Sequence, residues 1–310
     1  MTSRWLPAAL LAVALALAGC DDASPGAERS PSPAAPADPT VVTCPEAPAI
    51  GSIPSDRPDP DLPDHVPAGA TSVRLCPGGD KYTAVLSPYD ALTTHVSALV
   101  RAVNRQPSVD RPRCVRQWVP TYRMAFGYPD GSRFLVSGSM SSCYRLVAGS
   151  GWRTDSSPPL RTFVHRLLDQ RATADPPGPD RRAAQLSCGE QHQYGYTWPL
   201  GRATDLAVAV LCFGEPNHPR RARRAAIPAK DLAVLLDSMR TDTFSVAGLL
   251  GCPPGPRREY WLVGESAWRD PIAVTDHCEA LAVGGSREWE PRGRARRIVE
   301  RLVSAARPVP

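Results

Sequence analysis

The chain lacks several features that identify common enzyme classes. Its 310 residues contain no Walker-type Gly-rich loop, no His-Glu-x-x-His sequence and no Rossmann fingerprint. Aromatic residues make up only 6% of the sequence. We therefore expect no cofactor, no bound metal and no catalytic residues, and predict that the protein is not an enzyme.

Lysine is almost absent, since only Lys81 and Lys230 are lysines among the 36 basic residues. Such an excess of arginine, together with much alanine, proline and valine, is typical of a GC-rich genome. A formal net charge of +5 over 310 residues is also a weak field. The sequence thus predicts no nucleic-acid partner and leaves any protein partner unknown.

Basic residues are concentrated in two segments of the C-terminal half. One is the run with Arg220, Arg221, Arg223 and Arg224, and the other is the arginine-rich segment 292–301. A functional interpretation is contact with anionic lipid or cell-wall polymer, which would weaken as salt rises. The alternative is a set of solvated faces in an arginine-rich chain.

The first twenty residues have the pattern of an export signal. Arg4 precedes an apolar stretch from Leu6 to Leu17, which is too short to span a bilayer stably. The sequence Leu17-Ala-Gly-Cys20 resembles the lipobox of bacterial lipoproteins. That resemblance implies a signal peptide over residues 1–19 and a lipid on Cys20, which would hold the protein at the extracytoplasmic face of the cell membrane. An ordinary secretory signal with an incidental cysteine is the alternative.

Eight further cysteines form an even set, which in an exported chain predicts four disulfides. They are Cys44, Cys76, Cys114, Cys143, Cys188, Cys212, Cys252 and Cys278. Zinc ligation is the competing interpretation, but it favours close pairs such as Cys-x-x-Cys. The tightest spacing here, from Cys188 to Cys212, is far longer.

Two Pro-rich segments divide the chain. Residues 20–43 lack apolar bulk, so we expect a disordered tether rich in Pro, Ala, Ser and Asp, and residues 172–185 form a second Pro-rich linker. The parts on either side of this linker, residues 44–171 and 186–307, align with one another. The alignment places Cys76, Cys114 and Cys143 over Cys212, Cys252 and Cys278 at offsets of 136, 138 and 135 residues. The sequence therefore predicts an internal repeat.

Each copy has the pattern of an α+β unit, a small antiparallel sheet packed against helices and cross-linked by two disulfides. A strand ends at Cys76, and Ser87-Pro88 then begins a helix with Leu92, Val96, Leu99 and Val103 at helical spacing. A three-stranded meander follows, with a turn at residues 129–131, and a helix around residues 160–168 closes the copy. The second copy repeats this order, with helices after residue 228 and over 294–306.

The repeat favours one pairing among the 105 that eight cysteines allow. We expect Cys44–Cys76 and Cys188–Cys212 to hold the opening loop of each copy. Because the first and third strands of a meander run the same way, we expect Cys114–Cys143 and Cys252–Cys278 at one end of each sheet.

The arrangement resembles a group of secreted lipoproteins from actinobacteria. The resemblance rests on Val73-Arg-Leu-Cys-Pro77, on the turn Gly127-Tyr-Pro-Asp-Gly-Ser132 and on Cys143 with its strand, and it covers mainly residues 70–171. It implies lipid anchoring and this architecture, and it supplies no catalytic residues. We therefore expect a lipid-anchored cell-surface protein that serves as a non-catalytic binding or envelope-associated module.

Two other classes of protein stay open. An extracytoplasmic hydrolase would need a nucleophile, and the string nearest to Gly-x-Ser-x-Gly, Gly264-Glu-Ser-Ala-Trp268, lacks the second glycine. A sensory or solute-binding lipoprotein would need a hinge and an enclosed cleft. The loop that carries Asp56, Asp59, Asp61, Asp64 and His65 has ligand types suited to calcium, but no glycine for the sharp turn of a calcium loop.

Overall fold

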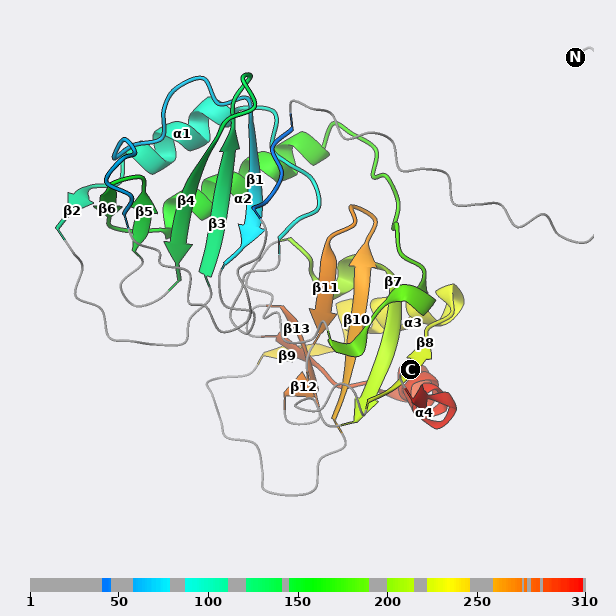
Figure 1. The fold of residues 1–310 in the computed structure, drawn as a ribbon. Coiled ribbons are helices and arrows are strands. Elements are labelled where there is room, and N and C mark those ends of the chain that lie inside the picture. Colours follow the sequence, from blue (N-terminus) through cyan, green and yellow to red (C-terminus); the bar gives the residue numbers. More distant parts are fainter. Residues whose placement is uncertain are drawn as a thin grey trace, which may run out of the picture. The chain divides into compact units, whose positions relative to one another are not determined.

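The structure is a computed structural model that describes residues 41–45, 58–78, 87–110, 121–140, 145–189, 200–214, 222–245, 259–274, 276–277, 280–284 and 287–308. Residues 38–310 form one compact unit. Within the described ranges the chain builds an α+β fold with antiparallel sheets and four α-helices (Figure 1). No helix in these ranges is long and apolar enough to cross a membrane.

The first sheet has six strands in the order β1-β3-β4-β5-β6-β2, and each strand is antiparallel to its neighbours. The strands are β1 Ser72–Pro77, β2 Ser108–Val109, β3 Thr121–Gly127, β4 Arg133–Ser139, β5 Leu146–Ala148 and β6 Gly151–Arg153. Val73 and Leu75 of β1 share one buried face with Phe134 and Val136 of β4. This period-two alternation is what a strand with one face on a core requires.

Helices α1 (Val96–Asn104) and α2 (Ser157–Arg171) pack on that face of the first sheet (Figure 1). Leu99 and Val103 of α1 and Phe163 and Leu167 of α2 are each fully buried in the same cluster as the strands. Their spacing of four residues places each pair on one side of its helix. The first core is therefore a helix layer on a sheet.

The second region has two sheets. One has five strands in the order β11-β10-β7-β8-β15, and the other has four in the order β12-β13-β14-β9. The strands are β7 Leu206–Gly214, β8 Arg223–Ala226, β9 Thr243–Ser245, β10 Glu259–Ser266, β11 Pro271–Val274, β12 Asp276–His277, β13 Ala280–Gly284, β14 Arg287–Trp289 and β15 Arg307–Pro308. Neighbouring strands in both sheets are antiparallel within the described residues.

Helices α3 (Ala229–Thr241) and α4 (Gly293–Ala305) pack on these sheets. Leu235 of α3 and Leu302 of α4 lie in one cluster with Leu211 and Trp289. A smaller cluster around Trp261 includes the segment that leads into this region, with Leu186 and Cys188 fully buried there. The second region thus has apolar contacts on both sides of β7 and β10.

Two predicted disulfides lie within the described residues and are formed. Cys44–Cys76 and Cys188–Cys212 have S–S distances of 2.02 and 2.04 Å. Each ties an incoming loop to the first long strand of its region, β1 or β7. The predicted pairs Cys114–Cys143 and Cys252–Cys278 lie outside the described residues.

The start of the first predicted helix was wrong by two turns. The helix begins at Val96, not at Pro88. Leu92 instead forms a two-way backbone bridge with Val73, at 2.8 Å in both directions. The amide and carbonyl of Leu92 therefore bond to Val73 of β1 and not within a helix. Leu92 and Val96 are both buried in the first core, which explains their apolar character without a helix at Leu92.

Candidate functional site

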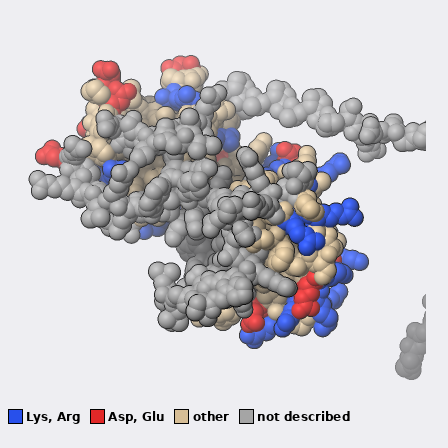
Figure 2. Space-filling model, turned by 60° about the horizontal axis from the view of Figure 1, so that its bottom comes forward, with Lys and Arg blue, Asp and Glu red and all other residues tan. Residues whose placement is uncertain are grey.

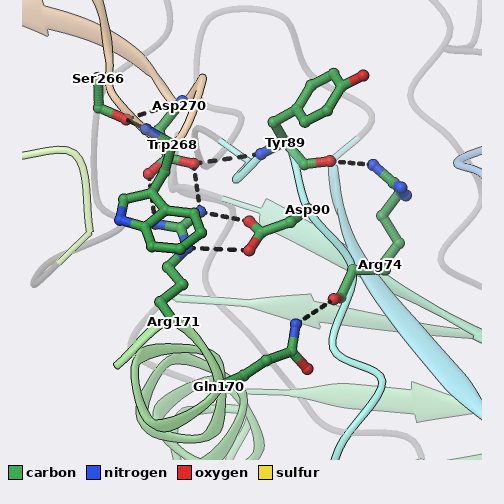
Figure 3. A network of polar contacts seen from close by, with 9 residues as sticks. Arg74, Tyr89, Asp90, Gln170, Arg171, Ser266, Trp268 and Asp270 are labelled. Atoms are coloured by element: carbon green, nitrogen blue, oxygen red, sulfur yellow. Dashed lines mark hydrogen bonds and ion pairs between the residues drawn. The ribbon is translucent and has the colours of Figure 1, made fainter. Parts of the chain in front are cut away.

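The most concentrated polar chemistry in the described structure surrounds the guanidinium of Arg171, the last residue of α2 (Figure 3). Its Nη1 and Nη2 donate to the two carboxylate oxygens of Asp270, each at 2.7 Å. Its Nε donates to Asp90 Oδ2 at 3.0 Å, and Nη2 also donates to Asp90 Oδ1. One arginine therefore binds two carboxylates that lie 81 and 99 residues away in sequence.

This cluster is largely removed from water. The side chains of Arg171 and Asp270 are each 6% exposed, and that of Asp90 is 25% exposed. Burial alone would lower the pKa of Arg171, but its hydrogen bonds and charge attraction to Asp270 and Asp90 outweigh burial and raise that pKa. The arginine is thus held as a cation. A buried pair of this kind loses much when one partner is removed, because the other charge is left uncompensated.

The residues around Arg171 complete its enclosure. The Trp268 ring lies over the guanidinium, with 5.0 Å from Cζ to the ring centroid. The amide of Tyr89 donates to Asp270 Oδ1 at 3.3 Å, and the amide of Asp270 donates to Ser266 Oγ at 3.1 Å. The bonds from Arg171 to Asp90 and Asp270 already use four of the five N–H donors of its guanidinium. We interpret the Arg171 cluster as a structural clamp, because a ligand anion would have to displace a carboxylate.

A second buried carboxylate, Glu265 of β10, holds the segment before the second region. Its Oε2 accepts from the amides of Asp180 and Arg181 at 2.8 and 3.0 Å, and its Oε1 accepts from Arg181 Nε at 3.2 Å. Arg269 Nε also donates to the carbonyl of Gly178, at 3.2 Å. The Pro-rich linker predicted over residues 172–185 is therefore fastened along its C-terminal part.

The accessible polar surface is of a different kind, and it lies on α4 and the strands next to it. Figure 2 shows blue side chains outnumbering red ones at the lower right, the side where Figure 1 places α4. The exposed arginines there are Arg223, Arg292, Arg294, Arg296, Arg297, Arg301 and Arg307. Four of them have partners among the described residues: Arg223 with the carbonyl of Ala306, Arg292 with Glu290, Arg296 with Glu300 and Arg301 with Asp231.

An open groove of about 460 Å³ runs between α3 and the start of α4. Its lining combines the apolar side chains of Ala233, Val234 and Ala295 with Asp237 and Arg294 at the rim. Ser238 at this groove is occupied, since it accepts from Trp289 Nε1 at 3.0 Å and donates to Asp242 Oδ2 at 2.7 Å. The groove thus offers charges of both signs.

The structure places only part of the predicted contact run. Arg223 and Arg224 lie on β8, and Arg224 Nη1 donates to the carbonyl of Leu186 at 2.7 Å. Both side chains therefore take part in holding the fold, although each keeps further N–H donors. Arg220 and Arg221, like the predicted lipidation site Cys20, lie outside the described residues.

Among the residues weighed for catalysis and calcium, Asp56 lies outside the described residues, and Ser266, Asp59 and Asp64 make local hydrogen bonds. Ser266 Oγ accepts from the amides of Trp268 and Asp270 at 3.0 and 3.1 Å, which makes it a turn residue at the end of β10. Asp59 Oδ1 accepts from the amide of Asp61, and Asp64 pairs with the ring of His65 at 3.0 Å. No group of three or more potential metal ligands occurs within the described ranges.

Comparisons with known proteins give no relative: no family model, no curated protein and no solved structure matches the chain.

Proposed function

We propose that the protein is a lipid-anchored, extracytoplasmic binding module without catalytic activity. The observation that carries this proposal is the pair of disulfides Cys44–Cys76 and Cys188–Cys212. Disulfides of this structural kind persist in oxidising compartments outside the cytosol. They agree with the export signal and with the lipobox-like sequence that ends at Cys20.

The distribution of polar groups supports a binding role at the surface. Arg171 binds Asp90 and Asp270, and Glu265 binds Arg181, so these enclosed charges already have partners. Exposed arginines are most concentrated on the face of α4, although others such as Arg133 and Arg161 are exposed in the first region. Contacts with an external partner are therefore most readily made through that face.

We further propose that the two regions are related copies. The strand order β1-β3-β4-β5-β6-β2 has a counterpart in β7-β10-β11 followed by β13-β14-β9. The strand register supports the same relation. Met124 pairs with Val136 in the first region, and Leu262 pairs with Val274 in the second. Each residue of the second pair lies 138 positions after its counterpart in the first. The two disulfides also join corresponding loops to corresponding strands.

Mass spectrometry of the exported chain tests the anchor. In a bacterial host that processes lipoproteins, we expect a mature N-terminus at Cys20 with the added mass of a diacylglycerol group and incorporation of labelled palmitate. Cys20→Ser should abolish both, whereas Ser24→Ala, a change of similar size in the adjoining segment, should leave both intact. An unlipidated mature chain that begins at another residue would contradict the anchor.

A further inference from the structure

The arginines of the α4 face lie on α4 itself and on β15, the strand that follows it. Arg294, Arg297 and Arg301 follow one another at intervals of three and four, so they lie along one side of α4. The adjoining side is buried through Ala295, Ile298, Val299 and Leu302. Directly after α4, β15 pairs antiparallel with β8, which brings Arg307 opposite Arg224 and Pro308 opposite Arg223.

Charge on this face exceeds what its own acidic groups neutralise. Residues 287–308 contain seven arginines and three glutamates, and Asp231 of α3 pairs with Arg301, so a surplus of three positive charges is left. Glu290 and Glu300 are each paired with a neighbouring arginine. Arg294, Arg297 and Arg307 are exposed, and their side chains have no partner among the residues that the structure describes. Like charges held this close repel, and an external anion would relieve the repulsion.

We propose that this arginine face, defined by Arg294, Arg297, Arg301 and Arg307, docks on the anionic phospholipid surface of the membrane. The inference rests on the proposed lipid anchor. An acyl chain on Cys20, joined by a short tether, would hold the folded part at a high effective concentration next to one leaflet. Under that condition a modest attraction decides which face turns to the lipid.

Arginine suits this role because its planar guanidinium makes two parallel hydrogen bonds to a phosphate. Each basic residue at an anionic bilayer contributes about 1 kcal/mol, and the attraction decays within about one Debye length. The three arginines that have no partner among the described residues would therefore favour salt-sensitive adsorption. The matching feature of the ligand is a dense array of phosphate headgroups.

Vesicle co-sedimentation of residues 21–310 tests the docking separately from the anchor, because this chain lacks Cys20 and retains the whole compact unit of residues 38–310. The test variant is Arg294→Gln/Arg297→Gln/Arg307→Gln. The matched control is Arg101→Gln/Arg133→Gln/Arg161→Gln, which removes three exposed arginines of the first region. Equal thermal unfolding of the three proteins would establish that all are folded.

We expect the unsubstituted chain to bind vesicles that contain about 30% phosphatidylglycerol. The test variant should bind them at least about tenfold more weakly, and the control variant should bind them as well as the unsubstituted chain does. Binding should disappear between about 50 and 500 mM salt and be absent with pure phosphatidylcholine. Equal weakening by both variants, or binding to a phosphate-rich wall polymer without binding to vesicles, would overturn the proposal. Loss of docking while Cys20 is still lipidated would refute this inference and leave the proposed function standing.

Discussion

Helix α2 follows β6 and helix α4 follows β14, and the arginines of these two helices have opposite environments. The last residue of α2, Arg171, is buried and binds two carboxylates. On α4, Arg294 and Arg297 point outward without a partner among the described residues. The number of arginines in a segment therefore does not indicate a binding surface. Whether an arginine can bind an external partner depends on its exposure and on how many of its N–H donors are already used.

The largest expected effect comes from removing the buried arginine. Arg171→Ala leaves Asp90 and Asp270 without their cation, and we expect a loss of about 3–5 kcal/mol in the free energy of unfolding. Arg297→Ala on α4 should change it by no more than about 0.5 kcal/mol. Urea denaturation measures both values. If the two substitutions lowered the free energy of unfolding by similar amounts, the proposed difference between α2 and α4 would be wrong.

The two described disulfides allow the two regions to be compared directly. Replacing both cysteines of Cys44–Cys76 or of Cys188–Cys212 by serine should cost roughly 3–4 kcal/mol in either case, in the chain-entropy model. The bonded residues are separated by 32 and 24 positions, so the two losses should differ by only about 0.3 kcal/mol. Chemical denaturation checks this.

Peptide mapping under non-reducing conditions adds an independent test of the repeat. It should find Cys114 linked to Cys143 and Cys252 linked to Cys278. A bond between Cys114 and Cys252 would contradict the proposal of related copies.

The smallest expected effect concerns the turns between the paired strands. The β3–β4 turn uses a carboxylate, because Asp130 Oδ1 accepts from Ser132 Oγ and from its amide, and these bonds lower the pKa of Asp130 below its ordinary 3.8. The β10–β11 turn uses the Ser266 hydroxyl instead. A lowered carboxyl pKa stabilises the fold above pH 3.8, and this contribution is lost as pH falls through the lowered value.

Acid should therefore loosen the first turn and leave the hydroxyl-held turn unchanged. An NMR pH titration of the Asp130 carboxyl and of the Ser132 and Asp270 amides would follow both. Asp130→Asn is the matched control, since its neutral oxygen still accepts hydrogen bonds. A transition at the Ser132 amide that persists in this variant would exclude Asp130 as its cause.

Local patterns in the sequence predicted most of the fold. Strand-like segments at 123–128 and 134–136, with a turn at 129–131, predicted the β3–β4 hairpin. The helical spacing of Leu160, Phe163 and Leu167 predicted α2. The start of α1 could not be predicted, because the spacing of Leu92 also suits a strand neighbour of Val73. The split between the sheets of the second region likewise has no local signal.

The Arg171 cluster was missed for the same reason. Asp90, Arg171 and Asp270 show no spacing that links them, and no pattern distinguished these residues from other charged ones in the sequence. A buried ion cluster is recognised only when its members meet.

The sequence by itself predicted the two described disulfides and the α+β class, because the repeat of the cysteines and the local spacing of apolar residues are visible along the chain. Only the tertiary structure decided which arginines are enclosed and which face outward. Arg171 meets partners 81 and 99 residues away, and β15 meets β8 across α3 and α4. Burial and donor occupancy depend on such distant contacts, and they separate a structural arginine from one that is free to bind.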